Sequence, residues 1–176
     1  PDEYKDLDKF KIIYGLHPSP FGKILLGLTE SDKAICHLWF IDDNFDDALK
    51  IMQDEWPGAQ LIENQKETEK IAQLIFNKKA EESSLRVLLK GTDFQVRVWK
   101  ALPKIPRGTT VTYSEVAVLI GNPKAIRAAA KVVAINRIAY VVPCHRVFPK
   151  GGNNKYRWSP QRKIDILEWE KKMNNN

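Results

Sequence analysis

The sequence predicts a mixed α+β protein in which a strand-rich first half precedes a mainly helical second half. Three β-rich runs separated by turn signals occupy the first 40 residues, and amphipathic helical patterns dominate after residue 90. The charge balance changes at the same place. Residues 1–90 carry 12 basic and 17 acidic side chains, whereas residues 91–176 carry 16 basic and 5 acidic ones. We therefore expect two domains, a scaffold over residues 1–90 and a polyanion-facing module over residues 91–176.

The first domain is predicted to start as a sheet and to continue with helices. Its β-rich runs are bounded by Pro, Ser, Glu and Asp turn residues, and its later apolar side chains recur at helical spacing. The expected strands are residues 10–16, 22–29, 33–40 and 85–89, and the expected helices are residues 45–56 and 67–77. Because short turns join the first three strands, we expect them to form an antiparallel meander.

The second domain is predicted to consist mainly of helices. Thr92 is a suitable N-cap for the first helix, and Pro160 stands in the first turn of the last one. The expected helices are residues 93–102, 114–120, 124–134 and 161–172. The middle two are short and flank the turn at residues 121–123, so they have the proportions of a helix-turn-helix motif.

Small and basic side chains share the helix expected at residues 124–134. Five alanines leave little bulk there, and Lys124, Arg127 and Lys131 supply positive charge. Such a helix can approach a nucleic-acid groove closely while its cations meet phosphates. The alternative is a helical hairpin that packs its alanines inside the protein. The excess of basic residues after residue 90 supports DNA binding enough to make it as well founded as the internal hairpin.

The overall composition is that of a chain able to bury a core. Of its 176 residues, 43% are hydrophobic. No apolar run approaches the roughly 18 residues of a membrane span, and the acidic N-terminus lacks the pattern of a signal peptide. The two cysteines, Cys36 and Cys144, cannot build a disulfide framework. We expect a soluble intracellular protein with two free thiols.

Two Cys-His pairs occur in different settings. Cys36-His37 lies within an expected strand, where neighbouring side chains point to opposite faces, so we expect a buried Cys36 and an edge-facing His37. Cys144-His145 follows Pro143, which cannot donate to a sheet ladder, so we expect the chain to leave a strand there and to present both residues. Arg146, Lys150 and His145 are near enough in sequence to lower the pKa of the Cys144 thiol. The alternative is that Cys144 is a small buried hydrophobic residue.

A zinc site is the other chemistry that these residues allow. Its ligands would come from the Cys and His residues of the chain, which are His17, Cys36, His37, Cys144 and His145. None of them shows the paired short spacings of structural zinc sites, and an adjacent Cys and His are poorly placed to chelate one ion. We therefore expect no metal.

Several motifs resemble those of the O6-alkylguanine-DNA alkyltransferases, which transfer an alkyl group from damaged guanine to their own cysteine. The matching segments are Gly91-Thr92-Asp93-Phe94-Gln95, Ile105-Pro106-Arg107-Gly108, Thr112-Tyr113-Ser114-Glu115-Val116-Ala117, Asn122-Pro123-Lys124-Ala125-Ile126-Arg127-Ala128, Pro143-Cys144-His145-Arg146-Val147 and Tyr156-Arg157-Trp158. They cover residues 91–170 densely and are most similar to the catalytic domain of the bacterial Ada type. Over residues 1–90 only the order and length of the elements match. The resemblance implies a ribonuclease-H-like first domain and a winged-helix, helix-turn-helix catalytic domain.

The resemblance also implies catalytic roles. Cys144 is the acceptor nucleophile, His145 takes its proton through a water, and Glu170 fixes the imidazole. Tyr113 assists base flipping and donates a hydrogen bond to the leaving guanine. Asn136 holds the turn that positions the active-site strand. The chemistry needs such a relay, because a free thiol is only partly ionised near neutral pH.

The remaining matches imply contacts to DNA. Arg127 enters the duplex in place of the flipped base, and Lys124, Ala128 and Lys131 accompany it on a helix in the minor groove. Four further residues are implied to form the substrate pocket. They are Val147, Tyr156, Arg157, whose backbone N–H binds the O6 atom, and Trp158.

The implied function is DNA repair by one irreversible transfer from O6-alkylguanine, and also from O4-alkylthymine, in double-stranded DNA. Such a methylated-DNA–protein-cysteine S-methyltransferase needs no cofactor. We expect a monomer without an obligate protein partner or a membrane, in a bacterial cytoplasm or a eukaryotic nucleus. The alternatives are a cysteine hydrolase with a Cys144–His145–Glu170 triad and a non-catalytic DNA-binding protein that senses lesions or regulates transcription.

The chain departs from the family next to the pocket. Lys155 stands where a glycine usually precedes the tyrosine, and Trp158-Ser159 stands where one or two glycines are common. Because these glycines line the alkyl pocket in the family, we expect methyl to be accepted and benzyl to be accepted poorly.

Overall fold

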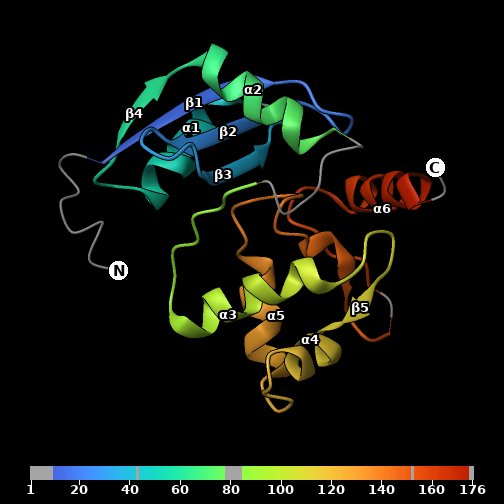
Figure 1. Ribbon diagram of the computed structural model, residues 1–176. Coiled ribbons are helices and arrows are strands. Elements are labelled where there is room, and N and C mark those ends of the chain that lie inside the picture. The colour runs from blue at the N-terminus through green and yellow to red at the C-terminus, as the bar shows by residue number, and fades with distance from the viewer. Residues whose placement is uncertain (1–9, 43, 78–84, 152, 175–176) are drawn as a thin grey trace. The chain divides into compact units, whose positions relative to one another are not determined.

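The computed structural model describes residues 10–42, 44–77, 85–151 and 153–174. The chain has a mixed α+β fold and divides into two compact units, residues 1–88 and residues 89–176 (Figure 1). The coarse fold class predicted from the sequence is therefore confirmed. The assignment of a scaffold role and a catalytic role to the two parts stays a prediction.

The N-terminal unit is built on a four-stranded sheet. β1 (Lys11–His17), β2 (Ile24–Thr29) and β3 (Ile35–Phe40) pair antiparallel in sequence order, as predicted. β4 (Gln60–Glu63) was not predicted and pairs parallel with the other side of β1, which gives the order β3-β2-β1-β4. β4 has only four residues, too few for its alternation to be visible in the sequence.

The strand expected at residues 85–89 is wrong. Only one isolated bridge, between Val87 and Ile35, forms in this segment. The helices α1 (Phe45–Glu55) and α2 (Gln65–Ile75) confirm the two expected in this half, and the side chains of Asn44 and Asn64 cap their N-termini.

The core of the N-terminal unit includes Cys36, which packs with Ile12 and Leu25 of the sheet and Met52 of α1. His37 is also fully buried and stacks on Trp39, with 5.7 Å between ring centroids. The expectation of an edge-facing His37 is therefore wrong. The physical reason is that both faces of β3 are covered, so neighbouring residues are buried although they point to opposite sides.

The C-terminal unit contains the four predicted helices. They are α3 (Asp93–Ala101), α4 (Tyr113–Leu119), α5 (Ile126–Ala134) and α6 (Pro160–Asn174), with a 3-10 helix at Leu102–Lys104 after α3. Thr92 caps α3 and Thr112 caps α4, each through a capping box completed by a residue three positions later. The indole Nε1 of Trp99 donates to the Val132 carbonyl at 3.0 Å and ties α3 to α5.

α5 begins two residues later than the sequence predicted. The N–H of Ala125 donates to the Asn122 carbonyl at 3.0 Å, which closes a turn through Pro123. Proline favours such a turn, and Lys124 therefore lies in the turn and not in the helix.

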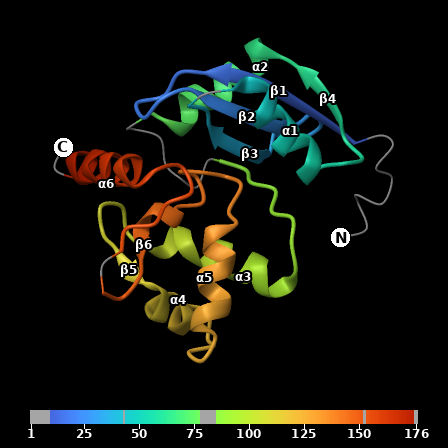
Figure 2. The same ribbon diagram turned by 180° about the vertical axis from the view of Figure 1, so that it is seen from behind.

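Two very short strands in this unit were not predicted. β5 (Val111–Thr112) pairs parallel with β6 (Val147–Phe148), and Figure 2 shows them side by side. The expected strand before Pro143 is absent among the described residues. Residues 139–141 form a turn instead, and Cys144–Arg146 form a 3-10 helix that leads into β6.

Candidate active site

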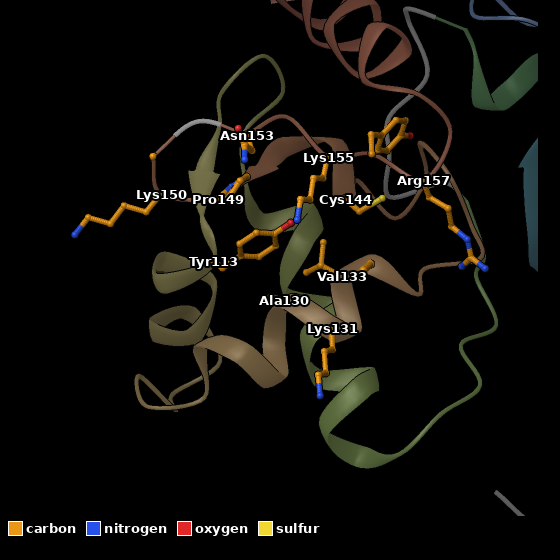
Figure 3. A pocket seen from close by; sticks show the side chains of 13 residues that line it. Tyr113, Ala130, Lys131, Val133, Cys144, Pro149, Lys150, Asn153, Lys155 and Arg157 are labelled. Atoms are coloured by element: carbon orange, nitrogen blue, oxygen red, sulfur yellow. The ribbon is translucent and has the colours of Figure 1, made fainter.

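A cavity of about 680 Å³ opens in the C-terminal unit, and Cys144 lies in its wall. Tyr113 at the start of α4 and four residues of α5 line one part of it. The rest is formed by residues 149–151, 153 and 155–157 (Figure 3). The parallel pairing of β5 with β6 explains this convergence. It places Thr112, the residue before Tyr113, opposite Phe148, four residues after Cys144.

The thiol of Cys144 is almost fully buried, and one side chain donates to it. Asn136 places its Nδ2 atom 3.2 Å from Sγ. Burial raises the pKa of the thiol to about 11, although the Asn136 bond and the charges of Lys163 and Arg157 act in the opposite direction. The sequence suggested Arg146 and Lys150 as the cations that act on the thiol, but Lys163 and Arg157 do so instead. Their effect is smaller than that of burial, so the pKa of Cys144 is raised and not lowered.

Asn136 joins the turn after α5 to the cysteine. Its Nδ2 also donates to the carbonyls of Ile138 and Val142, at 3.2 and 2.9 Å. Its Oδ1 accepts the Ile138 N–H at 3.0 Å. The amide group thus contacts both the turn at residues 136–142 and the sulfur atom that follows it. The expected role of Asn136 in positioning the active site stays a prediction.

Behind Cys144 lies a buried cluster of His145, Arg146 and Glu170. His145 Nε2 lies 2.7 Å from Glu170 Oε1, and the Arg146 Nη2 donates to the same oxygen at 2.8 Å. The Gly108 N–H donates to Glu170 Oε2 at 2.9 Å. Arg146 also donates to the Ile105 carbonyl at 2.7 Å. Each side chain of the cluster is at most 2% exposed.

Contacts within this cluster determine the protonation states of Glu170 and His145. Burial by itself would raise the pKa of Glu170, but the bonds and charges of His145 and Arg146 outweigh it and hold that pKa at about 2. Burial lowers the pKa of His145, although Glu170 opposes this. A neutral imidazole beside a carboxylate is therefore the resting state. The Nδ1 atom of His145 is buried and has no hydrogen-bond partner within the described part of the chain.

Lys163, which the sequence matched to the family's C-terminal segment without assigning it a role, lies buried next to the site. Its buried ammonium donates to the carbonyls of Val147 at 2.6 Å and Lys155 at 3.1 Å, and it lies 3.8 Å from the centre of the Phe148 ring. Burial lowers its pKa to about 8. The signal was available, because Lys163 shares its helical face with the buried Ile166, Leu167 and Glu170.

Some of the predicted pocket residues line the cavity and others do not. Tyr113, Tyr156 and Arg157 line the cavity, whereas Val147 and Trp158 are buried and do not. Burial raises the pKa of Tyr113, and the nearby Cys144 adds to this. The guanidinium of Arg157 donates to the Asn136 carbonyl at 3.1 Å, so this residue is tied to the turn beside the thiol.

The predicted DNA-binding residues lie together at the surface. Lys124, Arg127, Ala128 and Lys131 are all exposed, in the turn before α5 and on its outer face. The opposite face of α5 buries Ala129, Val132 and Val133. Both interpretations of the alanines therefore hold in part. Ala129 packs inside the unit, as in a helical hairpin, and Ala128 faces outward next to the basic residues, as a groove-binding helix requires.

Two searches of the described residues found nothing. No three His, Cys, Asp or Glu side chains gather there in a way that could hold a metal ion. No helix of that part of the chain is long and apolar enough to cross a membrane.

Comparison with known proteins gives a consistent result. A family model described as the DNA-binding domain of 6-O-methylguanine DNA methyltransferase matches residues 93–172. The methylated-DNA–protein-cysteine methyltransferase of Methanosarcina mazei is 37% identical over 166 residues, which cover 93% of this chain and 97% of that protein. The crystal structure of Mycobacterium tuberculosis OGT in complex with DNA has a TM-score of 0.71 and 30% identity, and the match covers 92% of this chain and 94% of that one.

Other relatives are longer than this chain. The bifunctional transcriptional activator and DNA repair enzyme Ada of Escherichia coli is 37% identical over 171 residues, which cover 93% of this chain but 46% of Ada. The chain thus spans about half the length of Ada, and the match covers 60% of a mimivirus relative.

Proposed function

The chain belongs to the methylated-DNA–protein-cysteine methyltransferase family, and we propose that it repairs O6-alkylguanine in double-stranded DNA by transferring the alkyl group to its own Cys144. One observation carries the proposal. A thiol in the wall of a cavity is followed directly by a histidine that is bonded to a buried carboxylate. O4-alkylthymine is a second substrate implied by the same chemistry.

The proposed reaction begins with the thiol proton. Because the pKa of Cys144 is raised to about 11, the thiol needs a base when it reacts. We assign this role to His145, whose buried and unpartnered Nδ1 would take the proton through a water. Glu170 holds the ring from the other nitrogen, at 2.7 Å, and stabilises the imidazolium that results.

The transfer itself is a displacement at the alkyl carbon. A bond forms between the sulfur and that carbon, the bond between carbon and O6 breaks, and its electron pair stays on the guanine, which regains a proton. Tyr113 is suited to donate a hydrogen bond to the leaving guanine, since it lines the same cavity as Cys144. The thioether product has no route back to a thiol here, so each molecule acts once.

Access to the base requires that it leave the duplex. Flipping costs a few kcal/mol, and less for a damaged base. In the proposal Arg127 takes the place of the flipped base, while Lys124 and Lys131 contact phosphates. The small and exposed Ala128 lets α5 approach the minor groove. Trp99 supports this helix from inside by its bond to Val132.

The finer fold assignment belongs to the same proposal. We infer that the N-terminal unit is ribonuclease-H-like, which its antiparallel meander with one parallel added strand supports. The pairing of β5 with β6 beside α4 and α5 supports a winged helix-turn-helix in the second unit.

One experiment tests the transfer. The protein is incubated with duplex DNA that carries O6-methylguanine and is then weighed by intact mass spectrometry. We expect a stoichiometric gain of one methyl group, and none in Cys144→Ala. Unchanged mass with tight DNA binding would support a lesion sensor. Repeated hydrolysis of an ester or amide substrate would support the Cys-His-Glu hydrolase.

The alkyl range is tested separately. Lys155 lines the cavity, whereas Trp158 does not, so we assign the restriction to Lys155. We expect O6-benzylguanine to inactivate the protein slowly and Lys155→Gly to speed this inactivation. Inactivation of the unchanged protein by benzylguanine at a rate comparable to that by methylated DNA would sink the idea.

A further inference from the structure

The charged side chains described in the wall of the active-site cavity are all positive. Four of the described residues that line it are cationic, and none of them is acidic. The four are Lys131, Lys150, Lys155 and Arg157. A cavity with this lining attracts an anionic group, because the cations have no carboxylate there to neutralise them.

Only one of these four cations extends into the cavity in Figure 3. The Arg157 guanidinium is bonded to the Asn136 carbonyl, and the Lys131 and Lys150 side chains run outward in Figure 3. Lys155 extends into the cavity on the side of Tyr113 in the same view. Within the described part of the chain, its ammonium makes no hydrogen bond or ion pair.

The backbone of Lys155 is held in place. Its carbonyl accepts a hydrogen bond from the buried ammonium of Lys163 at 3.1 Å, and the same ammonium fixes Val147. The next residue, Tyr156, packs edge-on against the buried Trp158, with 5.4 Å between ring centroids. The backbone that carries the cation is therefore anchored beside the cavity, while the Lys155 side chain itself is exposed.

We propose that Lys155 makes the site selective for O6-alkyl groups that carry a carboxylate, with O6-carboxymethylguanine as the simplest member of the class. This inference rests on the proposed function. In such an adduct the carboxylate is attached to the carbon that Cys144 attacks, so it enters the cavity with the reacting group. Without a cation it would lose hydration with no compensation, and the Lys155 ammonium replaces the lost water.

The covalent step is the same displacement with a different group. The S–C bond forms, the C–O6 bond breaks, and the guanine keeps the electron pair and regains a proton. The product is S-carboxymethyl cysteine at position 144, with its carboxylate still paired to Lys155. No oxidant, reductant or further reactant is consumed.

The test compares two adducts of nearly equal shape. Rates of transfer to Cys144 are measured with O6-carboxymethylguanine and with its neutral counterpart O6-carbamoylmethylguanine, both in the same duplex. We expect Lys155→Met to lower the ratio of the charged to the neutral rate by about five- to tenfold. Lys155→Arg keeps the charge and retains the ratio. Lys150→Met, which removes an outward-pointing cation of the same wall, also retains it.

The same measurement with the free bases removes the DNA phosphates. A ratio that Lys155→Met leaves unchanged on both the free bases and DNA would overturn the proposal. Equal slowing of both adducts on DNA, with no change on the free bases, would also overturn it, since Lys155 would then contact phosphate. Methyl transfer from O6-methylguanine DNA is run in parallel. Its absence in the unchanged protein would contradict the proposed function and not this selectivity alone.

Discussion

Cys36-His37 and Cys144-His145 are the same dipeptide in two different surroundings. Both cysteines are buried, and burial raises the pKa of each thiol, to about 12 for Cys36 and about 11 for Cys144. Burial by itself therefore separates the two pairs very little. What differs is the set of groups that contact each pair.

The first pair packs against apolar and aromatic side chains. Cys36 packs among Ile12, Leu25 and Met52, and His37 stacks on Trp39. The second pair has polar partners from distant parts of its unit. Asn136 donates to the sulfur, and Glu170 of α6 binds the imidazole.

Under the proposed function, the reactivity of Cys144 depends on polar partners from other parts of its unit and on the cavity that it lines. Asn136 is 8 residues and Glu170 is 25 residues away from its partner in the second pair. Cys144 also lines a cavity that a substrate can enter. The dipeptide by itself does not distinguish the two pairs. The residues next to it in the sequence and the groups that contact it in the fold do.

The largest expected difference is in alkyl transfer. Cys144→Ala should abolish the methyl gain from O6-methylguanine DNA, because no other thiol lines the described cavity. Cys36→Ala should keep the full gain and lose about 1 kcal/mol of stability, since it removes a buried sulfur from the core. Peptide mapping by mass spectrometry locates the methyl group. A methyl group on the peptide that contains Cys36 would contradict the comparison.

The next effect concerns the carboxylate of Glu170, which binds the imidazole of the second pair. Glu170→Gln should slow methyl transfer by about 100-fold, because the imidazole loses the group that stabilises its protonated form. It should also cost about 3 kcal/mol of unfolding free energy, because Arg146 stays buried without a negative charge beside it. Single-turnover rates and urea unfolding measure the two effects. Glu168→Gln, an exposed change on the same helix, is the matched control.

The charge of Glu170 also predicts an acid response of the second pair. Its pKa falls from an unfolded value of 4.5 to about 2 in the folded protein. A lowered pKa means that the carboxylate stabilises the folded state above pH 4.5 and that this contribution, about 3 kcal/mol, is lost as the pH falls toward 2. His145 acts in the same sense, since its lowered pKa makes the unfolded state bind the proton more readily below pH 6.5.

Hydrogen exchange at several pH values resolves the two pairs. Between pH 6 and pH 3 we expect protection of α6 and of residues 144–146 to fall more steeply than protection of β3. Glu170→Gln should flatten the steeper profile. Equal pH slopes in both regions of the unchanged protein would show that the buried carboxylate does not set the acid response.

The features that could be predicted from the sequence are those that depend on residues close together in the chain. Thr92 with Gln95 and Thr112 with Glu115 form capping boxes, and these short-range patterns identified α3 and α4. Cys144 and His145 were found because adjacent residues form a motif. The antiparallel meander followed from the short turns between its strands.

The parts that were not predicted depend on contacts between distant residues. The pairing of β5 with β6 joins segments of two residues each, which have no detectable period, although it places Tyr113 beside the cysteine segment. Lys163 was not identified as a buried cation because its carbonyl partners, at Val147 and Lys155, are backbone groups. Likewise, the burial of His37 depends on what covers the second face of β3, and the strand sequence does not specify this.

The smallest expected effect concerns the residues that cap α6 and α1, the helices that supply Glu170 and Met52 to the two pairs. Ser159 has a φ of +93°, in the left-handed region, while its side chain accepts the Arg162 N–H at 3.2 Å. Asn44 caps α1 with an extended φ of −122°. Only the first position therefore combines a capping bond with backbone strain.

The same replacement should consequently act differently at the two caps. Ser159→Gly relieves strain of about 1 kcal/mol, which offsets the lost cap and the extra freedom of the unfolded chain, so stability should change by less than about 0.5 kcal/mol. Asn44→Gly has no strain to relieve and should lose about 1 kcal/mol. Ser159→Ala loses the cap, keeps the strain and should also lose about 1 kcal/mol. Urea unfolding of the three variants measures the order. Equal losses for the two glycine variants would mean that the backbone at Ser159 is not strained.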